Sequence, residues 1–308
     1  MALIKDPKSV LVGKLEGVHL FHFDGAPCAQ RVRFALAEKG LSRGREVRFD
    51  ADDATACAGE QGAWTSRIVS LIKKDHLSAT YADIHPNLVV PALVHDGRLY
   101  RESMEIIEYL DEAFGGEPLV PKYDPEQLAE AEALTQLGKQ LHQSIRFVTF
   151  RWGLGSLAKL NAEESQTLKR LASQGSDEEK LAAFYEGYSN DAIDESVYVE
   201  HLRKLNDAFA MLESRFADGR PFITGPTLTM ADVIWAMKVL RLTECGYPFG
   251  RYYPGVNAWF VRIKNRPSFR MGVMGKHKFL NNAFKIKAAI ETVLGIGLVK
   301  AMDHYAFD

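Results

Sequence analysis

A proline interrupts the clearest strand pattern of this chain, and it restricts the fold more than any other single residue. The stretch NLVVPALVHDGRLY, residues 87–100, predicts two strands joined at His95-Asp96-Gly97, because an Asp-Gly pair between apolar runs is typical of a hairpin turn. Pro91 falls inside the first strand, where it cannot donate a hydrogen bond to a neighbouring strand. It therefore marks a sheet edge, a bulge or a cis peptide bond.

The residues before this hairpin predict a small sheet with a crossover helix. Residues 17–23 alternate apolar and polar side chains and predict a strand, residues 28–41 predict a helix, and residues 45–50 predict a second strand. The polar stretch 51–85 is expected to hold a helix around 64–74 and loop elsewhere, either as a functional segment or as a simple insertion.

After the hairpin the pattern becomes helical. A helix is expected over residues 102–116, and Asp124 followed by Pro125 is a typical helix start. From there nearly every window predicts helix, with a polar break at 173–195 interpreted as a loop region. We therefore place a domain boundary at 118–124.

One helix of this second half carries a strong start signal. In FITGPTLTMADVIWAMKVLRL, Thr229 and Asp232 have the spacing of a capping box, in which each side chain satisfies a backbone N–H of the other residue. The apolar run that follows predicts a helix in the middle of a bundle. It is expected to serve folding rather than chemistry.

Composition limits the kinds of partner. The chain has 308 residues, 46% of them hydrophobic and 25% charged, with a formal net charge of −2, so no nucleic-acid or membrane partner is expected. Cys28, Cys57 and Cys245 form neither a disulfide framework nor a zinc pattern, so no metal is expected. The start has no signal-peptide pattern and no stretch has the length of a membrane span, so we expect a cytoplasmic protein.

Three motifs in this order resemble the glutathione S-transferase family: APCAQRVRFALAEKGL, VVPALVHDGRLYRESMEIIEYLDE and GPTLTMADVIWA. The resemblance covers roughly residues 17–275. It implies an α/β thioredoxin-like domain at 15–118 that binds glutathione, and an all-α helical bundle at 124–308 with the second-substrate pocket and a C-terminal extension. Two segments, 147–168 and 210–269, look like the bacterial enzymes that cleave β-aryl ether bonds of lignin fragments with glutathione. Related dehalogenases and isomerases share this scaffold.

The resemblance also implies positions for glutathione. With a cis bond at Pro91, the backbone of Val90 would pair with the cysteinyl unit as an added strand does. At the predicted helix start, where N–H groups attract a carboxylate, Ser103 would bind the γ-glutamyl carboxylate and Glu102 its ammonium. The alternatives are that Pro91 is only an edge proline and that Ser103 only caps its helix.

The thiol-activating position departs from the family pattern. Many members have Ser or Cys just before the position of Pro27, but this chain has Ala26, and in the ether-cleaving relatives the key hydroxyl falls nearer Ala29. Cys28, in the first helical turn, is the candidate catalytic residue, as a donor to the glutathione sulfur or as a mixed-disulfide partner. The alternatives are a small buried cysteine, and backbone N–H groups that stabilise the thiolate unaided.

The second-substrate pocket is expected to be aromatic. Phe150, Trp152 and Tyr247 are the candidate substrate-binding residues, and the alternative for each is a place in the bundle core. The first functional hypothesis is a glutathione-dependent transferase or lyase that attacks an electrophilic aromatic substrate, working as a homodimer. The second is a catalytically impaired binding protein of the same fold, or one half of a heterodimer with a related chain.

Overall fold

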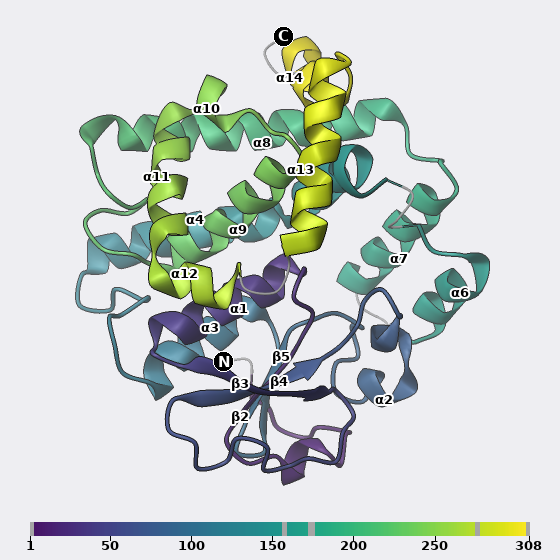
Figure 1. The fold of residues 1–308 in the computed structure, drawn as a ribbon, viewed down its shortest axis with the longest axis vertical. Coiled ribbons are helices and arrows are strands. Elements are labelled where there is room, and N and C mark those ends of the chain that lie inside the picture. Colours follow the sequence, from purple (N-terminus) through teal and green to yellow (C-terminus); the bar gives the residue numbers. More distant parts are fainter. Residues whose placement is uncertain (1–2, 156–158, 172–175, 275–277, 306–308) are drawn as a thin grey trace. The chain divides into compact units, whose positions relative to one another are not determined.

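The computed structural model describes residues 3–155, 159–171, 176–274 and 278–305. Contacts divide the chain into two compact units, which we describe separately (Figure 1). The first contains the chain up to Glu117 together with Leu160–Asn190 and Met271–Val273. The second contains Pro118–Lys159, Asp191–Arg270 and the chain from Met274. No helix in the described ranges combines the length and the apolar character that a membrane span requires.

The first unit is a mixed six-stranded sheet with helices, the thioredoxin-like arrangement that the resemblance implies. The strand order is β1-β6-β5-β2-β4-β3, with β2, β4 and β3 parallel to one another and β5 antiparallel to β2. Its elements are β1 (Leu3–Ile4), η1 (Val12–Lys14), β2 (Val18–His22), α1 (Pro27–Glu38), β3 (Ser42–Arg48), β4 (Ala63–Ile68), η2 (Asp75–Leu77), α2 (Ala79–Ala82), β5 (Ala92–His95), β6 (Arg98–Tyr100), α3 (Ser103–Ala113), α6 (Ala162–Leu171) and α7 (Ser176–Ser189).

The hairpin predicted around the proline is confirmed. Strands β5 and β6 pair in antiparallel fashion, and Asp96 and Gly97 at the turn have φ of 48° and 73°, as a two-residue turn between twisted strands requires. The Val90–Pro91 peptide bond is cis. Pro91 comes just before β5, so its missing N–H costs the sheet no hydrogen bond.

The helix expected around 64–74 is wrong, because residues 63–68 form strand β4, which lies between β2 and the edge strand β3. Strands β2 and β3 flank β4, and the polar side chains of Thr65, Ser66 and Arg67 are buried, Arg67 being 0% exposed. Arg67 donates to the carbonyl oxygens of Ala51 at 2.8 Å and Asp53 at 2.7 Å, which fixes the loop between β3 and β4. A strand with three consecutive buried polar side chains lacks the alternation of apolar and polar residues from which strands are predicted.

The loop expected at 173–195 is also partly wrong, because α7 occupies residues 176–189. Phe184 and Tyr188, one helical turn apart, are buried with their rings stacked at 5.7 Å. This apolar pair stabilises a helix whose overall composition is polar. The segment 160–190 belongs with the first unit, although it follows the first helices of the second along the chain.

The second unit is all-helical, as predicted. Asp124 accepts a hydrogen bond from the Gln127 N–H at 3.0 Å and begins α4, and the capping box of Thr229 and Asp232 begins the almost wholly buried α9. Its elements are α4 (Pro125–Gln140), α5 (His142–Thr149), the π-helical η3 (Phe150–Leu154), α8 (Glu195–Arg215), η5 (Phe216–Asp218), α9 (Met230–Glu244), α10 (Phe249–Tyr252), α11 (Pro254–Asn265), α13 (Lys278–Val293) and α14 (Gly297–Tyr305), with α12 (Pro267–Gly272) leading back to the first unit.

The return segment 271–273 touches α1 so closely that Gly272 tolerates no side chain. A Cβ at Gly272 would lie 2.5 Å from the backbone oxygen of Arg33. We expect Gly272→Ala to lower the free energy of unfolding by about 1–3 kcal/mol, since a packed backbone must shift to admit the methyl group. Urea unfolding followed by circular dichroism measures this. Gly13→Ala is the control, because a Cβ there meets nothing within 4 Å, and equal values for both variants would refute the close packing.

Candidate active site

The corner between β2 and α1 has no hydroxyl or thiol at Ala26 but has free backbone donors. Ala26 precedes α1 and makes no side-chain cap, and Cys28 in the first helical turn is partly exposed. The N–H groups of Cys28 and Ala29 donate to no acceptor within the described residues. Such groups at a helix N-terminus attract anions. The corner can therefore hold a negative charge without a hydroxyl.

The other polar side chains of this corner are bound inside the fold. Asp24 forms an ion pair with Arg43 at 2.8 Å and lies 3.7 Å from Arg33, so two guanidinium groups neutralise its negative charge. Arg33 donates to Nδ1 of His22 at 3.2 Å, so the other ring nitrogen carries the hydrogen and donates to Ser66 Oγ at 2.8 Å. Burial lowers the pKa of Arg33 to about 10. His22 and Asp24 thus shape the corner and are not exposed reagents.

The start of α3 has an unusual backbone. Glu102 precedes the helix with a φ of 65°, a conformation that is uncommon outside glycine and recurs at ligand sites. Ser103 is the first helical residue and is 7% exposed. Its hydroxyl accepts a hydrogen bond from Arg31 Nη1 at 3.2 Å, and no side chain caps this helix. The structure therefore does not show Ser103 as a side-chain cap of α3.

Arg31 is the residue that the sequence analysis missed. It is 5% exposed, and its buried Nε has no hydrogen-bond partner among the residues that the structure describes. It forms no ion pair with any residue in the described ranges. A buried guanidinium without a counter-charge is costly unless a ligand supplies one. The available signal was position: Arg31 lies one helical turn before Ala35, on the apolar face predicted for CAQRVRFALAEKGL.

The segment before β5 completes this region. Val90 is 6% exposed, and neither its N–H nor its C=O forms a hydrogen bond within the described chain. Val90 belongs to the same apolar cluster as Ala26 and Ala29. Because Arg31 links α1 to Ser103, the start of α1, the cis-proline segment and the start of α3 form one neighbourhood.

The three candidate substrate residues lie in the helical unit. Trp152 is 7% exposed, and Phe150 is half-buried at the start of the π-helical η3, a kind of segment that often occurs at functional sites. Tyr247 is 3% exposed, and its hydroxyl donates to Asn206. Its ring packs on Phe249 at 4.4 Å, which matches the core alternative for this residue.

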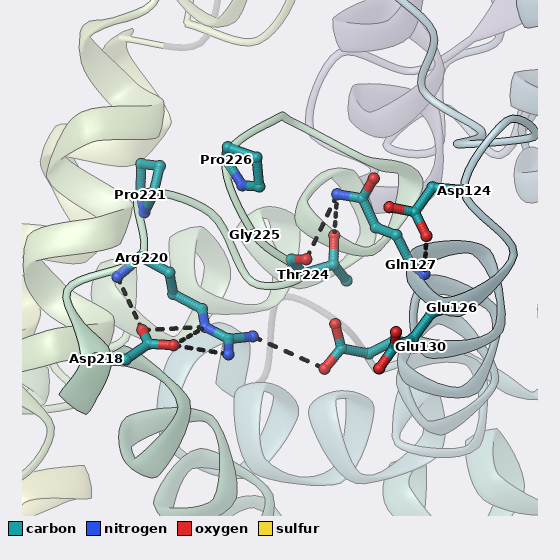
Figure 2. Close-up of a pocket in the computed structure, with 10 residues that line it drawn as sticks. All are labelled: Asp124, Glu126, Gln127, Glu130, Asp218, Arg220, Pro221, Thr224, Gly225 and Pro226. Carbon is teal, nitrogen blue, oxygen red and sulfur yellow. Dashed lines mark hydrogen bonds and ion pairs between the residues drawn. The ribbon is translucent and has the colours of Figure 1, made fainter.

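The helical unit also has a cavity of about 540 Å³ at the start of α4 (Figure 2). Its one basic side chain, Arg220, is paired with two of its acids, Asp218 at 2.8 Å and Glu130 at 3.7 Å. None of the predicted site residues lines it, so we assign it no ligand. In the described ranges no group of His, Cys, Asp and Glu side chains is arranged to hold a metal.

Known proteins match this chain over both units. Residues 20–118 match the glutathione S-transferase N-terminal domain and residues 178–267 the C-terminal domain. Protein LigF of Sphingobium sp. is 26% identical over 64% of this chain and 78% of its own length, and glutathione S-transferase Z1 of Arabidopsis thaliana is 28% identical over 48% and 57%. The crystal structure of β-etherase LigF has a TM-score of 0.67 at 23% identity, covering 83% of this chain and 98% of its own. A Drosophila mojavensis homologue solved with bound glutathione has a TM-score of 0.56 at 17% identity, covering 89% of this chain and 97% of its own. The chain belongs to the glutathione S-transferase family.

Proposed function

We propose that this protein binds glutathione in its first unit and uses the thiolate to attack an electrophilic carbon of an aromatic substrate. The observation that carries the proposal is Arg31, a buried guanidinium without a counter-charge that donates to Ser103 beside the N-terminus of α3. These groups together suit a carboxylate. The relative solved with bound glutathione supports the choice of ligand.

Each part of glutathione then has a partner of fitting chemistry. Arg31 and Ser103 bind the γ-glutamyl carboxylate, and Glu102 faces its ammonium. The unpaired backbone groups of Val90, next to Pro91, bind the cysteinyl unit as an added strand does. The sulfur lies at the start of α1, near Cys28.

The reaction needs a thiolate from a thiol whose ordinary pKa is about 8.5. The free N–H groups at the start of α1 and the Cys28 thiol stabilise the negative sulfur. The thiolate forms a carbon–sulfur bond, a carbon–oxygen bond breaks, and the leaving group departs as a phenolate. Phe150, Trp152 and Tyr247 are the residues proposed for the aromatic ring, although Tyr247 is mostly covered. The similarity to LigF supports β-aryl ether cleavage as the narrower proposal.

A second candidate function rests on Ala26, which offers no side-chain donor at the reactive corner. The chain would then bind glutathione without turnover, or pair with a related chain that carries the chemistry. Members of the family are generally dimeric, and we propose a cytoplasmic homodimer as the working form of the enzyme.

Calorimetric titration with reduced glutathione, in buffers of different ionisation enthalpy, tests the proposal. We expect binding with proton release at neutral pH, because the site favours the thiolate. Cys28→Ala is expected to keep binding but raise the pKa of the bound thiol by about one unit, the typical effect of losing one hydrogen bond to a charged group. Cys28→Ser, which keeps a donor, is the control.

The outcomes separate the hypotheses. Proton release in Cys28→Ala equal to that of the wild type would assign thiolate stabilisation to the backbone N–H groups alone. Binding without proton release would favour the binding protein. If the wild type binds no glutathione at all, the proposed function is wrong for this chain.

A further inference from the structure

The C-terminal helix α13 and the turn after it present a row of uncovered aliphatic side chains. Ile286, Ile290, Val293 and Leu294 are 61%, 54%, 87% and 65% exposed, and Ile296 is 47% exposed. The spacing of the first four is that of one helical face. We call these five residues the aliphatic face. The other large apolar side chains exposed in the described ranges, such as those at positions 10, 72 and 123, do not form such a helical row.

The opposite side of α13 is anchored, so the helix cannot turn this face inward. Lys287 donates to the backbone oxygen of Trp152 at 2.9 Å and to Glu291 at 2.5 Å. A Cβ at Gly246 would come within 2.9 Å of the Ala288 Cβ, so the helix lies close against the end of α9. Both anchors belong to the helical unit, and α13 and α14 are the yellow helices of Figure 1.

The second helix of the tail is pinned as well. Tyr252 and Arg251 bind Asp303, and Arg203 donates to the Tyr305 carbonyl at 2.9 Å. Leu298 and Met302 of α14 are buried. The tail thus has a fixed inner side, and its outer side is aliphatic.

The charge of this segment indicates what covers the aliphatic face. Residues 276–308 contain five lysines and three acidic residues, Glu291, Asp303 and Asp308, whereas the whole chain has a net charge of −2. Glu291 is already paired with Lys287, and Asp303 with Arg251. A segment that combines exposed aliphatic side chains with an excess of lysine is typical of helices that lie in the surface of an anionic membrane.

A second copy of the chain fits this segment less well. In a symmetric pair the same surface meets itself, so two lysine-rich segments would face each other. Glu291 and Asp303 of each segment are already paired within their own chain, with Lys287 and Arg251. The family match ends at residue 267, so the tail is additional to the matched domains.

We propose that the aliphatic face inserts into the surface of an anionic phospholipid membrane and holds the protein there without spanning it. The net charge of the whole chain conceals this local excess of lysine, which is why the sequence analysis expected no membrane partner. The proposal does not depend on glutathione.

Sedimentation of the purified full chain with phospholipid vesicles tests the proposal. We expect binding to vesicles of phosphatidylcholine mixed with phosphatidylglycerol, weak binding to phosphatidylcholine alone, and loss of binding at high salt. The variant Ile290→Asp/Val293→Asp is expected to bind the mixed vesicles at least about tenfold more weakly. The matched control is Val10→Asp/Ile72→Asp, which charges two isolated side chains that are 78% and 69% exposed. It should bind as the wild type does.

Three results would overturn the proposal. The first is no sedimentation of the wild type with the mixed vesicles, and the second is equal weakening by both variants. The third is sedimentation velocity without lipid that shows the wild type as a larger species than Ile290→Asp/Val293→Asp, since a second copy would then cover the face. Circular dichroism of both variants confirms that each is folded.

Discussion

Replacing Asp232 with alanine is expected to lower the free energy of unfolding by about 3–5 kcal/mol, the range for breaking a buried polar network. The carboxylate is completely buried and accepts hydrogen bonds from the N–H groups of Ile223 at 3.0 Å and Thr229 at 2.9 Å and from the Trp259 indole at 2.8 Å. Alanine leaves these buried donors without a partner, and each such donor costs about 1–3 kcal/mol. Urea unfolding followed by circular dichroism measures the change.

The matched control is Asp124→Ala, which removes another aspartate that caps a helix in the same unit. Asp124 is exposed and accepts one hydrogen bond, from Gln127. Its loss is expected to cost about 1 kcal/mol, since water replaces the missing acceptor. Equal losses for the two variants would show that the buried network around Asp232 adds nothing beyond an ordinary cap.

The pH dependence of Asp232 gives the same prediction a second readout. Burial raises the pKa of this carboxyl from 3.8 to about 6. Between these values the folded chain binds more protons at this site than the unfolded chain, so the contribution of Asp232 to stability falls as the pH rises. The difference in stability between wild type and Asp232→Asn should therefore shrink from pH 3.8 to about pH 6. A difference that grows over this range would reverse the sign of the shift.

The features predicted correctly from sequence are those with a local physical signal. The turn at Asp96-Gly97 needs residues that tolerate positive φ, and the starts of α4 and α9 need side chains that accept from the first N–H groups. Both requirements concern residues only a few positions apart in the sequence. A short stretch of sequence is therefore enough to predict the turn and the two helix starts, and the structure confirms all three.

The features missed depend on partners far away in the sequence. Strand β4 holds Arg67 next to its C-terminal end, where the loop after β3 supplies three carbonyl acceptors for the guanidinium. The two-residue β1 is too short for any periodicity and exists because β6 pairs with it. No local pattern shows that such partners will be present, so the sheet was predicted only in part.

The candidate site shows the same division. Val90, Glu102 and Ser103 came from a family resemblance, while Arg31 came from the structure, because only the fold reveals that a charged residue is buried without a counter-charge. Cys28 stays a prediction, since its partial exposure fits both a donor to the sulfur and an inert helix-start cysteine. Burial and missing partners are thus the information that the structure adds.

Replacing Arg31 with methionine is expected to weaken glutathione binding by roughly 10- to 100-fold, the value of hydrogen bonds to a charged group. Its guanidinium donates to Ser103 at 3.2 Å, and its buried Nε has no partner in the described part of the chain, so the γ-glutamyl carboxylate is the acceptor that we assign to it. The unliganded variant should be as stable as the wild type or more so, because methionine removes a buried charge that nothing in the described ranges neutralises. Calorimetric titration and urea unfolding measure the two quantities.

Two controls make this prediction specific to the carboxylate. Arg33→Met changes another buried arginine of α1, but Arg33 donates to the carbonyl oxygens of Gly272 at 2.8 Å and Asp24 at 2.9 Å. This variant should therefore lose about 1–3 kcal/mol of stability for each acceptor left without a donor. Cysteinylglycine lacks the γ-glutamyl group, so wild type and Arg31→Met should bind it equally weakly. If Arg31→Met weakens glutathione and cysteinylglycine by the same factor, or destabilises the fold as Arg33→Met does, then Arg31 is a structural residue. The guanidinium of Arg31 would then stabilise the fold, and only Ser103 and the N-terminus of α3 would bind the γ-glutamyl carboxylate of glutathione.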